Sequence, residues 1–121
     1  MTVQEFYEAV GGDYTAAKKI LMNDRMIRMF LPKLAEDPCR AKLETAWKKQ
    51  DRKEMFEALH AMKGVCANLG LTSLSRKASD ALEPIRPGTD QTISEEELSG
   101  KVAAVCEQFD ATIAKVGDIT L

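Results

Sequence analysis

The chain contains a single histidine, His60, followed three residues later by Lys63 and then by Gly64. If this segment is helical, His60 and Lys63 lie one turn apart, and both side chains can reach the same small anion. An imidazole is partly neutral near pH 7 and is then nucleophilic, whereas an ammonium group pairs well with phosphoryl oxygens. The combination favours phosphoryl transfer to His60, with Nε2 as the expected attacking atom and with catalysis by positioning and charge neutralisation.

The apolar pattern around His60 predicts that its side chain faces solvent. On a helical wheel for residues 52–69, the apolar stripe lies opposite His60. Gly64 and Phe56 share the exposed side, although a mid-helix glycine costs about 1 kcal/mol relative to alanine. Both are explained if another protein approaches His60 closely, because Gly64 and Ala67 leave room and Phe56 offers apolar contact area. If an N-terminal helix covers Phe56 instead, this residue belongs to the core. The residues on the exposed face around His60 are Lys53, Phe56, Glu57, Lys63, Gly64 and Ala67.

Capping signals divide the chain into helices joined by short loops. Thr2, Asp51 and Ser94 each stand three residues before a glutamate, which is the pattern of a capping box. Residues 24–50 form either one bent helix or two, because prolines interrupt the pattern. The expected helices span about residues 3–10, 14–21, 24–50, 52–69, 72–83 and 95–116, with a loop over residues 85–93.

No segment shows the alternation of a strand, so we expect an all-α fold. Amphipathic helices joined by short loops predict an antiparallel four-helix bundle over about residues 24–117, flanked by short N-terminal helices over about residues 2–22. Residues 1–121 would form one domain. The apolar residues expected to pack inside include Ile20, Met22, Met26, Met29, Met55, Ala58, Leu59, Met62, Val65, Cys66, Leu69, Leu98, Val102, Val105, Phe109, Thr112 and Val116.

Composition excludes several classes of function. The net charge of -2 does not favour binding of nucleic acid, and no stretch has the roughly 20 apolar residues that cross a bilayer. No signal peptide is visible and the three cysteines lack a C-x-x-C pattern, so we expect a cytoplasmic protein with reduced thiols. A lone histidine does not favour a metal or haem site. Neither a Gly-rich phosphate loop nor a magnesium-binding carboxylate cluster is evident, so the chain should not use ATP.

The stretch His60-Ala61-Met62-Lys63-Gly64, followed by Ala67-Asn68-Leu69-Gly70-Leu71, Leu74 and Leu82-Glu83, resembles the signature of histidine phosphotransfer (HPt) domains. Gly11-Gly12-Asp13-Tyr14 and Phe30-Leu31 are similar to free-standing bacterial members. The resemblance covers most of the chain and is strongest over about residues 51–83. Pro32 and Pro38 depart from the family, because they interrupt a bundle helix that is usually longer.

The resemblance implies a phosphocarrier, without kinase activity of its own, in a two-component phosphorelay. Its partners would be response-regulator receiver domains or a hybrid histidine kinase, and the receiver would supply the aspartate and the Mg²⁺; the chain itself would need no cofactor. His60, Lys63 and Gly64 would act as phosphate carrier, phosphate stabiliser and space for docking. A second basic or amide side chain often assists in the family, and Arg76 and Arg86 are candidates.

A second hypothesis is a helical adaptor that docks a receiver or another protein without carrying phosphate. The presence of both His60 and Lys63 favours the carrier. We expect a monomer, because one chain completes the bundle. The identity of the receiver, the direction of phosphate flow and the regulated process cannot be derived from these residues.

Overall fold

The computed structural model describes residues 1–120. Within this range the chain is all-α, with no strands, as predicted. No helix among these residues is long and apolar enough to span a membrane. The elements are α1 (Val3–Val10), α2 (Tyr14–Leu21), α3 (Asp24–Phe30), the 3-10 helix η1 (Leu31–Glu36), α4 (Cys39–Lys49), α5 (Arg52–Asn68), α6 (Thr72–Leu82), the 3-10 helix η2 (Glu83–Ile85) and α7 (Glu95–Val116).

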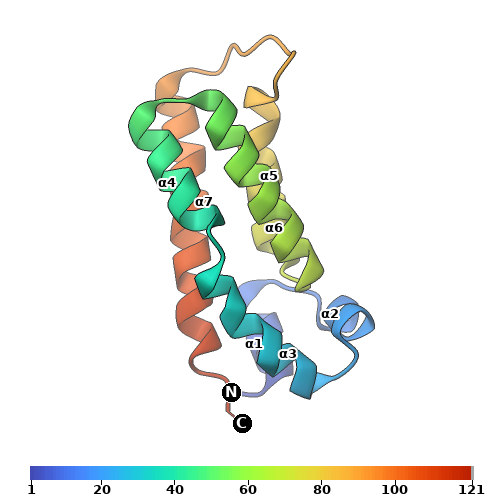
Figure 1. Ribbon diagram of the computed structural model, residues 1–121. Coiled ribbons are helices and arrows are strands. Elements are labelled where there is room, and N and C mark those ends of the chain that lie inside the picture. The colour runs from blue at the N-terminus through green and yellow to red at the C-terminus, as the bar shows by residue number, and fades with distance from the viewer. Residues whose placement is uncertain (121) are drawn as a thin grey trace.

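Helices α4, α5, α6 and α7 form an antiparallel four-helix bundle, which confirms the predicted architecture (Figure 1). The α4–α5 turn and the long α6–α7 loop lie at one end of the bundle. The α5–α6 turn, helices α1–α3 and both termini lie toward the other end. The two ends of the chain lie side by side, and the amide of Thr120 donates a 2.7 Å hydrogen bond to the carbonyl of Met1.

The segment over residues 24–50 forms two α-helices, which settles the alternative that the sequence left open. Helix α3 ends at Phe30, and Pro32 lies in the first turn of η1, where its missing N–H breaks no bond. The carboxylate of Asp37 then accepts a 2.9 Å hydrogen bond from the amide of Cys39 and caps the start of α4. The departure from a single long helix is therefore caused by the prolines and by this cap.

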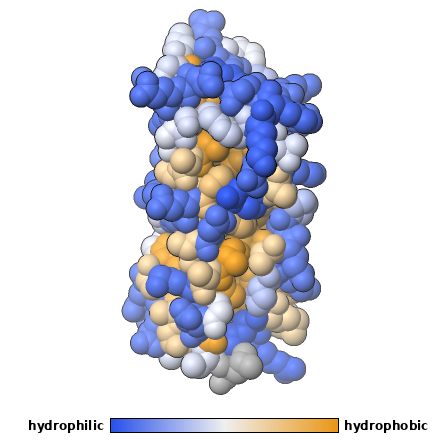
Figure 2. Space-filling view, turned by 90° about the vertical axis from the view of Figure 1, so that its left-hand side faces the viewer, coloured by the Kyte–Doolittle hydropathy of each residue, from blue (hydrophilic) through white to orange (hydrophobic). Residues whose placement is uncertain are grey.

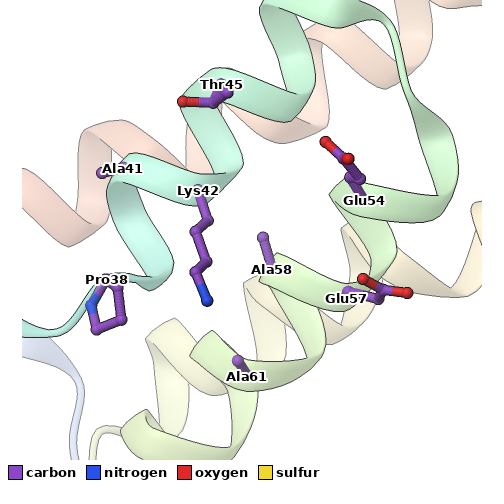
Figure 3. A pocket seen from close by; sticks show the side chains of 8 residues that line it. All are labelled: Pro38, Ala41, Lys42, Thr45, Glu54, Glu57, Ala58 and Ala61. Atoms are coloured by element: carbon purple, nitrogen blue, oxygen red, sulfur yellow. The ribbon is translucent and has the colours of Figure 1, made fainter.

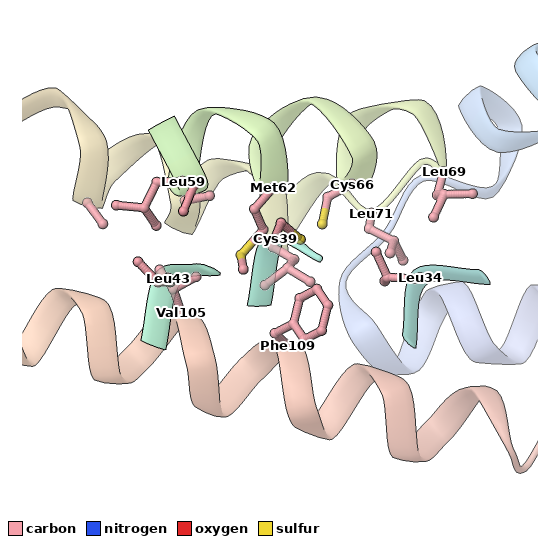
Figure 4. Packing of buried hydrophobic residues seen from close by; sticks show 14 of the residues in the cluster. Leu34, Cys39, Leu43, Leu59, Met62, Cys66, Leu69, Leu71, Val105 and Phe109 are labelled. Carbon is pink, nitrogen blue, oxygen red and sulfur yellow. The ribbon is translucent and has the colours of Figure 1, made fainter. Parts of the chain in front are cut away.

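The buried face of α5 confirms the predicted helical wheel. Side chains of α5 point toward those of α4 and α7 in the interior (Figure 4). Val65 is the exception in the predicted stripe, because it is only half-buried. The buried members of the stripe are Met55, Ala58, Leu59, Met62, Cys66 and Leu69, and they belong to one core with Leu98, Val102, Val105 and Phe109 of α7, where Thr112 is also buried.

The N-terminal helices differ from the prediction in which side chains they bury. Ile20, Met22 and Met29 are 51%, 77% and 49% exposed, so their expected packing role is wrong. Helix α2 is short, and its one buried side chain is Ala17. Ala17 packs closely on the backbone of Gly70, and Tyr14 and Leu21 are partly buried against the core, whereas Ile20 faces solvent.

A backbone joint ties α2 to the end of α5. The amide of Asp13 donates a 2.8 Å hydrogen bond to the carbonyl of Gly70. Gly70 has φ 73°, and a Cβ there would lie 2.7 Å from Cβ of Ala17. Only glycine fits both the left-handed conformation and this close approach. The Gly-Gly-Asp and Asn-Leu-Gly motifs are thus two halves of one contact that fixes the end of α5.

The capping boxes are only partly as predicted. The box at Thr2 is complete, with bonds of 2.8 and 3.1 Å to Glu5 in the two directions. Asp51 and Ser94 each accept the amide hydrogen bond three residues later, but within residues 1–120 neither following glutamate returns a bond. Glu54 lies near Lys49 instead, at 3.4 Å.

An ion pair links α4 and α7 on one side of the bundle. The guanidinium of Arg40 binds both carboxylate oxygens of Asp110, with both distances 3.1 Å. Figure 2 looks onto this side and shows apolar side chains between hydrophilic ones along much of its length. Half-buried Trp47 and Cys106 lie in this seam.

Candidate functional site

Helix α5 presents His60 to solvent near its middle. The helix begins after Asp51, whose carboxylate accepts a 3.1 Å hydrogen bond from the amide of Glu54. His60 is exposed, and Lys63 follows one turn later as a half-buried side chain. The hydroxyl of Ser75 on α6 donates a 3.1 Å hydrogen bond to the carbonyl of Lys63, which ties this turn of α5 to its neighbour. The predicted exposure of His60 is confirmed.

Phe56 lies directly beside His60. The two rings are stacked, with centroids 5.8 Å apart and an interplanar angle of 18°. Phe56 is half-buried and packs against the core. Its ring also lies under the guanidinium of Arg86, with Cζ 5.3 Å from the centroid. Phe56 is therefore covered by Arg86, which directly follows η2, and not by an N-terminal helix, and only part of its ring remains free.

Arg86 is held by a carboxylate at the end of α6. Its Nη2 and Nε donate hydrogen bonds of 2.6 and 3.2 Å to the two oxygens of Glu83. The hydrogen bond from Arg86 lowers the pKa of Glu83, and the positive charge of Lys63 lowers it further. The same bond raises the pKa of Arg86. Sequence reasoning gave Glu83 no function of its own, although the three-residue spacing of opposite charges was a usable signal.

Gly64 lies on the exposed side of α5 with open space around it. A Cβ at this position would meet no atom within 4 Å. Packing within the chain therefore does not require glycine here. Ala67 is also exposed and lies one turn further along. Gly64 and Ala67 therefore place no bulky side chain on the surface beside His60.

Lys53 and Arg76 are the other basic residues that the sequence suggested for partner binding. Both side chains are exposed. Among residues 1–120, neither forms a hydrogen bond or an ion pair with His60 or Lys63. Of the two candidate arginines, the structure places Arg86 beside Phe56 and leaves Arg76 on the exposed side of α6.

A groove between α4 and α5 runs beside His60. It has a volume of about 470 Å³. Lys42 reaches from α4 across this space toward Ala61, the neighbour of His60 (Figure 3). The groove depends on how two helices pack, so the sequence pattern did not predict it. Its lining residues are Pro38, Ala41, Lys42, Thr45, Glu54, Glu57, Ala58 and Ala61.

In a comparison with protein families, the model of the Hpt domain matches residues 25–116. This range is well over half of the chain, and the chain therefore belongs to the Hpt domain family. Membership implies a phosphotransfer role in a two-component phosphorelay, as a phosphocarrier rather than a kinase, with response-regulator or kinase components as partners. Comparisons with curated proteins and with solved structures give no significant match.

Proposed function

We propose that the chain is a phosphorelay intermediate that carries one phosphoryl group on His60. The observation that supports this most directly is the exposed imidazole in the middle of α5, with Lys63 one turn away and open space at Gly64. A carrier needs an accessible nucleophile, a nearby cation and room for the donor. Membership of the Hpt domain family supports phosphotransfer as the chemistry of this arrangement.

The transfer step is an in-line displacement at phosphorus. The lone pair of an unprotonated imidazole nitrogen of His60, which we expect to be Nε2, attacks the phosphorus of an aspartyl phosphate. The N–P bond forms while the acyl O–P bond breaks, and the electron pair stays on the aspartate carboxylate. The ammonium of Lys63 then neutralises phosphoryl oxygens. Return of the group to an aspartate reverses each of these changes.

The receiver domain would dock on the exposed face of α5. Gly64 and Ala67 let its backbone come close to His60, and the free part of Phe56 offers apolar contact. Lys53, Arg76 and Arg86 would supply charge at the edge of this contact. The receiver would contribute the Mg²⁺ next to its aspartate, and this chain would act as a monomer.

The proposal is tested by incubation of the chain with receiver domains phosphorylated at aspartate, in the presence of Mg²⁺. We expect label to move to this chain and to be acid-labile and base-stable, as a phosphoramidate bond is. A panel with every receiver of the source organism would also identify the partner. The variant His60→Gln should accept no label. Equal labelling of His60→Gln and wild type would show that His60 is not the carrier.

A further inference from the structure

The Glu83–Arg86 pair stands at the edge of the phosphorylation site. Glu83 begins η2, and Arg86 follows its last residue, Ile85, which is fully buried. The carbonyl of Arg86 accepts a 2.6 Å hydrogen bond from the hydroxyl of Thr89. The backbone at Arg86 is thus anchored, while its side chain remains free to change partner.

The side chains of Arg86 and His60 both lie against the ring of Phe56. The guanidinium is 5.3 Å from the centre of Phe56, and the ring of Phe56 is 5.8 Å from that of His60. Glu83 is also close enough to Lys63 to feel its charge. The carboxylate of Glu83 therefore binds Arg86 directly, and the positive charge of Lys63 also acts on it.

We propose that Glu83 is a positioning residue, which holds Arg86 away from His60 in the unloaded carrier and yields it to the phosphoryl group after transfer. This inference rests on the proposed function of His60. Arg86 would then change from a carboxylate partner to a phosphoryl partner. Glu83 would set how tightly the carrier retains phosphate, since it competes with the phosphoryl group for the same guanidinium.

Charge and exposure both support this exchange. The side chains of Glu83 and Arg86 are 53% and 42% exposed, and exposed ion pairs contribute little to stability. A phosphoryl group brings up to two negative charges and three acceptor oxygens, against one charge and two oxygens on the carboxylate. The planar guanidinium fits either group through two parallel hydrogen bonds. The phosphoryl group is therefore the stronger competitor once it is present on His60.

The experiment compares wild type, Glu83→Gln, Arg86→Gln and the double variant. Each protein is phosphorylated with phosphoramidate, in which the imidazole displaces ammonia from phosphorus, and the decay of phosphohistidine is followed by ³¹P NMR. Glu83→Gln should lengthen the lifetime roughly threefold, the size of one exposed ionic interaction. Arg86→Gln should shorten it by a similar factor. In the double variant the effect of Glu83→Gln should vanish, because the released partner is missing.

A second measurement separates positioning from a merely structural role. The Nε–H signal of Arg86, assigned by its loss in Arg86→Gln, should shift when His60 of the wild type is phosphorylated. A matched control is Asp110→Asn, which releases Arg40 from an equally bidentate pair on the α4–α7 side. It should leave the phosphohistidine lifetime unchanged.

Two results would overturn the inference while leaving the carrier role intact. One is an unchanged lifetime in Glu83→Gln. The other is a lengthening of equal size in the presence and absence of Arg86, which would mean that Glu83 does not act through the guanidinium. Failure of phosphorylated receivers to label wild-type His60 would instead refute the proposed function itself.

Discussion

The phenolic hydroxyl of Tyr7 donates a 2.6 Å hydrogen bond to the carbonyl of Leu69, the residue that caps the end of α5. Carbonyls at the end of a helix lack partners within the helix, and a buried one must find another donor. Tyr7 is 1% exposed, so this bond lies inside the core. The N-terminal helix α1 therefore supports the helix that carries His60.

Removal of this hydroxyl should destabilise the fold. Tyr7→Phe leaves the ring in place but deprives the Leu69 carbonyl of its donor, which should lower the free energy of unfolding by about 1–2 kcal/mol. Urea unfolding followed by circular dichroism measures the loss. Tyr14→Phe is the matched control, because the hydroxyl of Tyr14 bonds the carboxylate of Asp24 in a less buried place. Equal losses in the two variants would contradict the special role of the buried bond.

The same tyrosine predicts a decline in stability at high pH. Burial raises the pKa of Tyr7 well above its ordinary value. A group whose pKa is raised by folding stabilises the fold fully below its unfolded pKa, here about 10, and this contribution is lost as the pH rises above that value. The free energy of unfolding should fall by up to about 1.4 kcal/mol per pH unit between pH 10 and 11.

The difference in the free energy of unfolding between wild type and Tyr7→Phe isolates the contribution of the Tyr7 hydroxyl. Burial also raises the pKa of the Cys39 and Cys66 thiols to about 12, so both proteins should lose stability from their ionisation. Only wild type also loses stability from ionisation at position 7. The difference in the free energy of unfolding between the two proteins should therefore become smaller as the pH rises. Urea unfolding at pH 9 and pH 11 measures this gap, and a constant gap would contradict the prediction.

Gly70→Ala should be more harmful than alanine at an equally left-handed glycine elsewhere. Gly70 and Gly88 have φ 73° and 84°, so both substitutions strain the backbone by about 1 kcal/mol or more. Only at Gly70 would the new methyl group also meet Ala17 and the carbonyl of Asp13, at 2.7 and 2.9 Å. We expect an additional loss of about 1–3 kcal/mol at Gly70. Urea midpoints of the two variants provide the comparison, and similar midpoints would exclude a close-packed joint.

Local patterns predicted α5 and its site better than they predicted contacts between distant elements. The helical wheel placed His60 correctly because apolar periodicity reports which face of one helix is buried. The cover over Phe56 could not be predicted in this way, because it depends on where η2 places Arg86. The expected loop at Ile85 was also wrong, since this residue ends η2 and is fully buried.

The N-terminal errors have a similar physical origin. An apolar stripe indicates that a helix can pack, but not which of its side chains will find a facing surface. Helix α2 approaches the backbone of Gly70 through Ala17, whereas Ile20 of the same helix is half exposed. The glycine motifs carried the information about this joint, but the two motifs are far apart in the sequence and their contact became visible only in the fold.

Lys63→Ala should impair the chemistry and leave the fold intact. The side chain is half-exposed, so the free energy of unfolding should change by less than about 0.5 kcal/mol. Loss of one charge-assisted contact to the phosphoryl oxygens should slow transfer or shorten the lifetime of phosphohistidine roughly tenfold. Single-turnover transfer from a phosphorylated receiver and ³¹P NMR measure the two quantities. Lys101→Ala on α7 should change neither the transfer rate nor the phosphohistidine lifetime. If Lys63→Ala also left both unchanged, Lys63 would not have its assigned role.

Gly64→Leu tests whether open space beside His60 serves a docking partner. Gly64 and Gly100 are both exposed glycines inside helices, and a Cβ at either position would meet no atom within 4 Å. Leucine should therefore increase helix stability at both sites by up to about 1 kcal/mol, which thermal unfolding by circular dichroism measures. Only Gly64→Leu places bulk where a receiver would approach His60, so only this variant should lose transfer, by about tenfold or more. Phosphorylation by phosphoramidate should remain normal in both variants, because the small donor needs little room. Full transfer from the receiver to Gly64→Leu would mean that the partner reaches His60 from another direction.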